Sequence, residues 1–173
     1  MGCLINQGYT VPCASVGGAE IVYLGNWSSE TAHTMDSNNV VTAVANSNGV
    51  YTFEQEIETA GLVQTATTDR ANLTAFMDTN MSIKLFGLDA ETRNLFVDLL
   101  RAPIYAIIKS NEGLFYVAGV ETPGRLSEGT ASLGVALGDM NGAEITINFK
   151  SKNGVFLIDG DLLGTDIPLL PVS

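Results

Sequence analysis

Alternation of apolar and polar positions dominates this chain and predicts many short β-strands. The pattern appears first over residues 19–24 and returns at 40–44, 82–86 and 143–150. A period of two is typical of strands that turn every second side chain towards a core. The recurrence of such short segments, without a regular strand-helix alternation, favours a mainly β protein.

Turn signals separate these predicted strands. Asn and Gly tolerate positive φ, so the Asn-Gly pairs at 48–49 and 153–154 predict tight turns. The Ser-Asn-Glu-Gly run at 110–113 predicts a hairpin between two further β-rich segments. The segments flanking these turns are 51–58, 104–109, 114–120 and 155–158, and another β-like run extends from Gly61 to Thr68. Periodicity leaves residues 72–77 open between helix and strand, and it favours a loop over residues 26–39.

One α-helix is predicted after residue 88. Asp89 is a suitable N-cap, Glu91 suits the first turn, Arg101 suits the far end, and Pro103 stops the helix. The apolar stripe that should pack on the core consists of Leu95, Phe96, Leu99 and Leu100. Together with the strands, this predicts a β-sandwich or barrel with one flanking α-helix.

Three carboxylates stand out in the predicted strand at 51–58. Glu54, Glu56 and Glu58 alternate with more apolar neighbours and would share one face of that strand. Like charges at this spacing repel each other, so the face must meet water, a cavity or a partner's basic groups. A solvated face is the simplest interpretation.

The chain divides into three parts by pattern. Residues 1–15 lack periodicity and predict an N-terminal arm, residues 16–158 form the β-sandwich or barrel domain, and residues 159–173 form a C-terminal tail. The tail carries the apolar Ile167, Leu169 and Leu170. We expect it to dock either on its own domain or on a neighbouring subunit.

Charge narrows the range of functions. The 173 residues include 19 acidic and 8 basic side chains, a net charge of −11, and the first basic residue is Arg70. Gripping nucleic acid needs clustered Lys and Arg, so direct DNA binding is not expected. An acidic wall could instead guide DNA by repulsion. No apolar run approaches the length that crosses a bilayer, so no membrane partner is expected.

Candidate chemistry is sparse, and we expect no enzyme activity. The only histidine, His33, could pair with Cys3 or Cys13 as a base and a nucleophile, but nothing in the spacing supports this. The thiol state of the two cysteines stays open, with free thiols favoured over a disulfide. Glu54 and Glu56 could be a glycosidase pair, although acids are common on strand faces.

Cofactors are not expected either. The glycine-rich stretch 129–142 lacks a phosphate-binding motif and precedes a strand instead of a helix, so strand packing and turns explain its glycines better. Asp139 and the 159–161 Asp-Gly-Asp segment faintly resemble calcium ligands, but the remaining loop ligands are missing. Local turns stabilised by aspartate side chains are the simpler interpretation.

Part of the chain resembles a known family of structural proteins. The segment Leu-Asp-Ala-Glu-Thr-Arg-Asn-Leu at 88–95, the hairpin after it, the run at 128–134 and the Gly-Asp-Met-Asn-Gly-Ala-Glu-Ile-Thr segment at 138–146 resemble tail-tube and tail-ring proteins of tailed bacteriophages. The resemblance covers about residues 82–149. It implies a β-sandwich or barrel that assembles into rings, hexameric in a tail tube, which stack into a conduit for DNA.

The resemblance leads to a specific expectation. The protein would be a virion structural protein of the phage tail, assembled in the host cytoplasm, with copies of itself and other tail or connector proteins as partners. DNA would pass through the lumen without specific binding, with Glu54, Glu56 and Glu58 as candidate lumen-facing acids. The alternatives are another connector, ring or virion component, or a carbohydrate-binding β-sandwich with Trp27 and Tyr23 in an aromatic platform.

Overall fold

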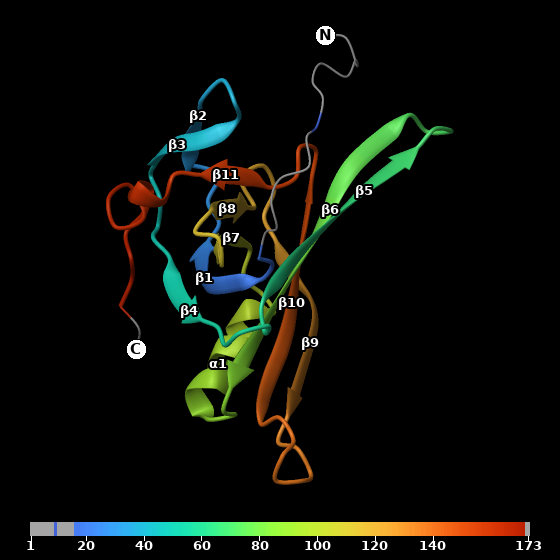
Figure 1. Cartoon of the computed structure of the whole chain (residues 1–173), viewed down its shortest axis with the longest axis vertical. Coiled ribbons are helices and arrows are strands. Elements are labelled where there is room, and N and C mark those ends of the chain that lie inside the picture. Colours follow the sequence, from blue (N-terminus) through green and yellow to red (C-terminus); the bar gives the residue numbers. More distant parts are fainter. Residues whose placement is uncertain (1–8, 10–15, 172–173) are drawn as a thin grey trace.

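Two β-sheets and one helix form the described part of the chain, which in this computed structural model comprises residue 9 and residues 16–171 (Figure 1). The seven-stranded sheet has the order β2 (Ala32–Met35), β3 (Val40–Ala45), β11 (Phe156–Ile158), β8 (Phe115–Ala118), β7 (Ile104–Ser110), β1 (Ala19–Asn26) and β4 (Tyr51–Glu54). The four-stranded sheet has the order β5 (Gly61–Asp69), β6 (Thr74–Phe86), β10 (Gly142–Ser151) and β9 (Arg125–Ser132). Strands make up 52% of the described residues and helices 8%. The expected β-sandwich with one flanking helix is confirmed.

The central strands β1 and β7 are buried on both faces. Val22 and Leu24 of β1 point into the core between the two sheets, whereas Tyr23 points into a second core on the far side of the seven-stranded sheet. β7 follows the same rule, with Ala106 in the first core and Ile107 in the second. Their sequences are therefore almost continuously apolar, because neither face meets water.

The second core lies where the seven-stranded sheet curls over the C-terminal residues. Ile167 is fully buried there, and the backbone of Val50 donates to Pro168 O at 2.9 Å and accepts from Leu170 N at 2.9 Å. The short 3-10 helix at Gly160–Leu162 precedes this contact. The C-terminal tail thus docks on its own domain through Ile167, while Leu169 stays half exposed.

The helix α1 (Ala90–Leu99) begins where the sequence predicts. Asp89 Oδ1 accepts a hydrogen bond from Thr92 N at 2.8 Å and caps the first turn. Leu99 is buried, and Leu95 and Phe96 pack against the core between the sheets. The packing role predicted for Leu100 is wrong, because this residue ends the helix as its C-cap and is 52% exposed. Arg101 lies beyond the helix.

The hairpin predicted at residues 110–113 is confirmed. β7 and β8 pair antiparallel, and Ser110 N donates to Leu114 O at 2.8 Å. Gly113 adopts a φ of +82°, which an L side chain rarely tolerates. The segment 72–77, left open by periodicity, belongs to β6 from Thr74 onwards.

The predicted strand at 51–58 is wrong beyond Glu54. β4 ends there, and a turn follows in which Thr59 N donates to Glu56 O at 3.2 Å and Glu58 has a φ of +64°. Ile57, expected on an apolar strand face, is 84% exposed in this turn. Consequently Glu54, Glu56 and Glu58 do not share one strand face.

Two strands lie where the sequence predicts none. β2 falls inside the predicted loop 26–39, and β9 runs into the start of the glycine-rich stretch. Both strands contain few apolar residues, so the alternation of apolar and polar positions does not predict them. The predicted N-terminal arm, residues 1–15 with Cys3 and Cys13, lies outside the described residues except for Tyr9.

Candidate functional site

The most distinctive surface is the side of the four-stranded sheet that faces away from the core. On β10, the residues Ala143, Ile145, Ile147 and Phe149 are buried, so the residues between them point outwards. The register carries this alternation to β6 and β9. We call the outward residues of these three strands the open face; they are Phe76, Asp78, Asn80, Ser82, Lys84, Phe86, Arg125, Glu128, Thr130, Ser132, Glu144, Thr146, Asn148 and Lys150.

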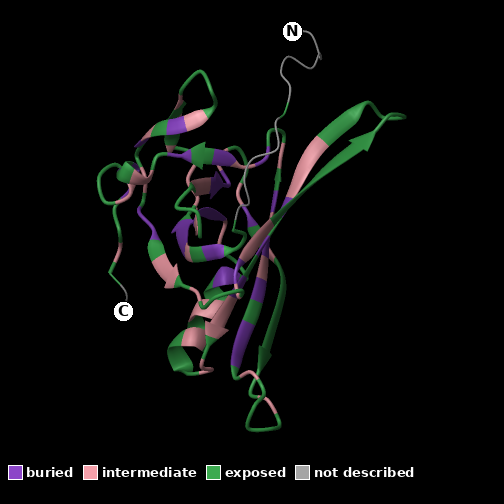
Figure 2. Cartoon of the chain, in the orientation of Figure 1, coloured by how far each residue is buried: buried purple, intermediate pink, exposed green. Residues whose placement is uncertain are grey.

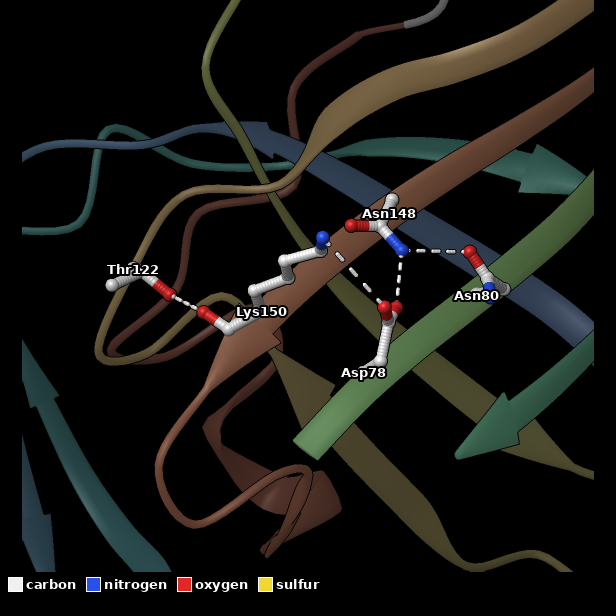
Figure 3. Close-up of polar contacts among 5 residues, drawn as sticks. All are labelled: Asp78, Asn80, Thr122, Asn148 and Lys150. Carbon is white, nitrogen blue, oxygen red and sulfur yellow. Dashed lines mark hydrogen bonds and ion pairs between the residues drawn. The ribbon is translucent and has the colours of Figure 1, made fainter. Parts of the chain in front are cut away.

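Neighbouring strands of the open face are joined by polar contacts (Figure 3). The Asn148 side chain on β10 donates to Asp78 and, at 2.8 Å, to Asn80 Oδ1, both on β6. Lys150 Nζ lies 3.8 Å from Asp78 Oδ2, and Lys84 Nζ lies 2.6 Å from Glu144 Oε1. Exposed ion pairs add little stability, so their main effect is to neutralise charge locally.

The open face is balanced in charge, unlike the chain as a whole. It carries three basic residues and three acidic ones, whereas the chain has 19 acidic and 8 basic residues. The basic set is Lys84, Arg125 and Lys150, and the acidic set is Asp78, Glu128 and Glu144. Hydroxyl and amide side chains fill the positions between them. This face offers no cationic grip for nucleic acid, and its large apolar side chains are Phe76 and Phe86, near the two ends of β6.

Both outer edges of the four-stranded sheet are unpaired within the described residues. β5 and β9 are the edge strands, and all residues of β9 except Leu126 are exposed (Figure 2). Unpaired N–H and C=O groups along such an edge can pair with a strand of another chain. β9 carries neither a proline nor an inward charge that would block such pairing.

A side chain marks where the β5 edge begins. The Gln55 side chain donates to Lys84 O at 3.2 Å and accepts from Lys84 N at 3.0 Å, in the place of a paired strand. β5 pairs with β6 only from Gly61 onwards, opposite Ser82. Gln55 therefore satisfies the backbone of β6 beyond the end of β5.

The β5–β6 hairpin extends well past the rest of the sheet (Figure 1). From Val63 to Ala75 its residues are exposed on both faces, and no core supports them. At the tip, Asp69 Oδ1 accepts from Ala71 N at 2.8 Å, and Leu73 is 92% exposed with a φ of +52°. A two-stranded ribbon is marginally stable alone, so a partner would stabilise this part.

The acidic residues predicted as a site do not belong to the open face. Glu54 lies at the end of β4 in the other sheet, and Glu56 and Glu58 lie in the turn that follows. The sequence of β9 and of the outer half of β6 gives one weak signal for the open face. Polar residues such as Ser, Thr, Asn and Glu alternate there with smaller or apolar residues.

The other candidate groups are engaged in the fold. Tyr23 is buried and Trp27 is partly buried against the second core, so they do not form an exposed aromatic platform. His33 lies on β2, where partial burial lowers the pKa of its imidazole, and the cysteines proposed beside it lie outside the described residues. Asp139 and Asp159 accept hydrogen bonds from backbone N–H groups within their own turns.

Neither a metal cluster nor a membrane-spanning helix is found in the described part. Across residue 9 and residues 16–171, no three His, Cys, Asp or Glu side chains are grouped so that they could hold a metal ion. The helices of the same residues are too short or too polar to cross a bilayer.

Comparison of the chain with models of known protein families gave no match, and comparison with curated proteins gave none.

Proposed function

We propose that this protein is a virion structural protein that self-assembles into rings, which stack to form the tail tube of a bacteriophage and conduct DNA. The observation that carries the proposal is the open four-stranded sheet, with one buried face, one charge-balanced polar face and two edges that are unpaired among the described residues. A surface of this kind can be completed by further copies of the same sheet.

Strand direction permits such a ring. Neighbouring strands of the sheet are all antiparallel, so with four strands β5 and β9 run in opposite directions. When one copy is placed beside the next in the same orientation, its β9 meets the neighbour's β5 antiparallel. The ladder then continues unchanged, and this heterologous contact closes into a ring if the rotation between copies allows it.

The stagger within the sheet also suits a closed barrel. The centre of β5, at Thr65, lies opposite Asp78, whereas the centre of β9 lies level with Ser82 and Ile83, through their pairing with β10. The two strand centres are therefore offset by between four and five residues. If the centre of β9 in one copy pairs with the centre of β5 in the next, this offset accumulates over every four strands and tilts the strands by about 40° to the ring axis. Closed barrels have tilts of about 35–45°.

The same geometry sets the width of the conduit. Six copies would form a wall with a backbone diameter of roughly 45–50 Å, from the standard strand spacings. Side chains on the inner side reduce the opening to roughly 35–40 Å, which is wider than a DNA duplex. The open face would line this lumen, because the other face is covered by the seven-stranded sheet.

The charge pattern fits a conduit that does not retain DNA. Lys84 and Lys150 are paired with Glu144 and Asp78, so few basic groups are free to hold phosphates. In this arrangement Glu54 lies in the sheet outside the barrel wall and cannot face the lumen. The acidic lining predicted from the sequence is replaced by a neutral, hydroxyl-rich and amide-rich wall.

Electron microscopy and native mass spectrometry of the full chain test the proposal. We expect closed rings that stack into tubes at high protein concentration; rings that never stack would favour a connector ring. A shortened variant, in which Asn-Gly replaces residues 65–78 between the paired residues Gln64 and Thr79, removes five of the nine residues of β5 but keeps the core residues of both sheets. It should fold and remain monomeric.

Circular dichroism and thermal unfolding of the shortened variant provide the control for folding. A wild-type chain that stays strictly monomeric at high concentration would contradict the proposal. Rings that form as readily from the shortened variant would show that β5 does not make the contact.

A further inference from the structure

An exposed apolar loop follows β9. Leu133, Val135 and Leu137 are 71%, 103% and 109% exposed, and the loop projects beyond the end of the four-stranded sheet (Figure 1). We call residues 133–137 the aliphatic loop. Three aliphatic side chains held together in water are unfavourable, since burying one Leu or Val contributes about 1.5–3 kcal/mol, and such a cluster indicates an interaction site.

The aliphatic loop has a defined shape. Asp139 Oδ2 accepts from Val135 N and from Ala136 N, both at 2.8 Å, and Asp139 N donates to Ala136 O at 3.1 Å. These backbone hydrogen bonds also lower the pKa of the Asp139 carboxyl, which stays ionised and keeps accepting them. The apolar side chains are therefore presented outwards by a fixed turn.

A groove of matching character lies between β4 and α1. It has a volume of about 780 Å³, and its apolar wall consists of Leu24, Phe53, Leu85, Leu95, Leu99 and Ile104. All of these belong to the core between the sheets or pack against it. The groove is thus a place where the main core opens to solvent, with room for several aliphatic side chains.

We propose that the aliphatic loop of one copy docks into the groove between β4 and α1 of the neighbouring copy. The inference rests on the proposed ring. Continuing centre-to-centre pairing of β9 with the neighbour's β5 brings residues 133–137 level with about residues 56–60 of that neighbour. This connector leads directly from β4, the strand that forms one wall of the groove.

The proposed contact between the aliphatic loop and the groove is heterologous. The loop and the groove are on different elements, so each copy offers one of each and binds two neighbours. Apolar side chains of the loop meet the apolar wall of the groove, which also has the carboxylates of Glu91 and Asp98 in its lining. The docked loop would reinforce the hydrogen bonds between β9 and β5, whose side chains are mainly polar.

Disulfide cross-linking between two variants tests the position of the loop. In a background with Cys3→Ser and Cys13→Ser, a Leu137→Cys chain is mixed with a differently tagged Asn94→Cys chain, since Asn94 lines the groove. We expect a cross-linked heterodimer on a non-reducing gel after mild oxidation. The matched control is Arg93→Cys, which is exposed on the same helix but does not line the groove, and it should cross-link weakly.

Loop substitutions test the energetic contribution. Val135→Ser with Leu137→Ser should raise the protein concentration needed for assembly at least about tenfold, from the loss of buried apolar area. Ala136→Ser in the same loop should assemble like the wild type. Because all three residues are exposed, circular dichroism of the monomers should be unchanged.

The outcomes separate this inference from the ring itself. Rings that form normally from the Val135→Ser, Leu137→Ser variant, or cross-linking that is as strong with Arg93→Cys as with Asn94→Cys, would overturn the loop contact and leave the ring proposal intact. A strictly monomeric wild type without cross-links would overturn both.

Discussion

Two glycines allow neighbouring elements of this protein to approach each other closely. A Cβ at Gly124 would clash with the ring of the buried Phe149, and one at Gly129 would lie 2.6 Å from the Phe96 ring. Both glycines therefore leave space for an aromatic ring. Gly124 leaves space for Phe149, and Gly129 allows the Phe96 side chain of α1 to pack on β9. For Gly129, the prediction that close packing explains glycines of the glycine-rich stretch is confirmed.

Thr79 is the residue at which we expect a stabilising substitution. It is 1% exposed on β6, and within the described part of the chain its hydroxyl has no hydrogen-bond partner. Thr79→Val removes this unsatisfied group while keeping the shape, so the free energy of unfolding should rise by about 1 kcal/mol. The melting temperature should rise by about 2–4 °C, measured by thermal unfolding.

The control for Thr79 is Thr79→Ala, which also removes the hydroxyl but leaves a small cavity and should lower the melting temperature. A lower melting temperature for Thr79→Val as well would mean that the hydroxyl makes a stabilising bond.

At the scale of elements, the sequence predicts those parts whose signals are local. Asp89 marks the start of α1, and the turn at Gly113 fixes the β7–β8 hairpin. The sequence pattern predicts β4 too long because Glu58 adopts a positive φ, which its residue type does not signal. The pattern does not predict β9 because this strand pairs at an exposed edge, where side chains need not be apolar. The open face follows from that pairing, so the sequence alone could not locate it.

The cap of α1 predicts an acid-dependent loss of stability. The hydrogen bond from Thr92 N lowers the pKa of Asp89 in the folded chain. The ionised cap therefore stabilises the fold above the pKa of the unfolded chain, and this contribution is lost as pH falls through the lower folded pKa. Asp89→Asn keeps a capping oxygen but cannot titrate.

Urea unfolding at several pH values checks this. We expect the wild type to be more stable than Asp89→Asn at pH 7, and the difference to shrink below about pH 4. A difference that stays constant with pH would show that the charge of Asp89 does not contribute. Asp69 and Asp139 also have lowered pKa values, so both proteins should lose stability in acid.

At the scale of the whole molecule, charge opposes the proposed assembly. Each copy has a net charge of −11, whereas β9 is neutral, β5 carries a single charge at Asp69, and the aliphatic loop is apolar. Copies at low ionic strength should repel each other over tens of ångströms, since the Debye length is about 30 Å at 0.01 M salt and about 10 Å at 0.1 M.

Added salt should therefore promote assembly. We expect the concentration at which rings appear to fall when sodium chloride is raised from 0.01 M to about 0.5 M, where the Debye length is well under 10 Å, as measured by light scattering and electron microscopy. The shortened hairpin variant should stay monomeric throughout. Assembly that weakens with salt would indicate that ion pairs between copies drive it.

The position of β11 determines how late during synthesis the seven-stranded sheet can be completed. Residues 156–158 lie between β3 and β8, parallel to the first and antiparallel to the second. Until they emerge from the ribosome, β2 and β3 have no strand that links them to the rest of their sheet. Such distant pairings form late, so the newly made chain finishes folding only near the end of its synthesis, after β5 and β9 are already complete.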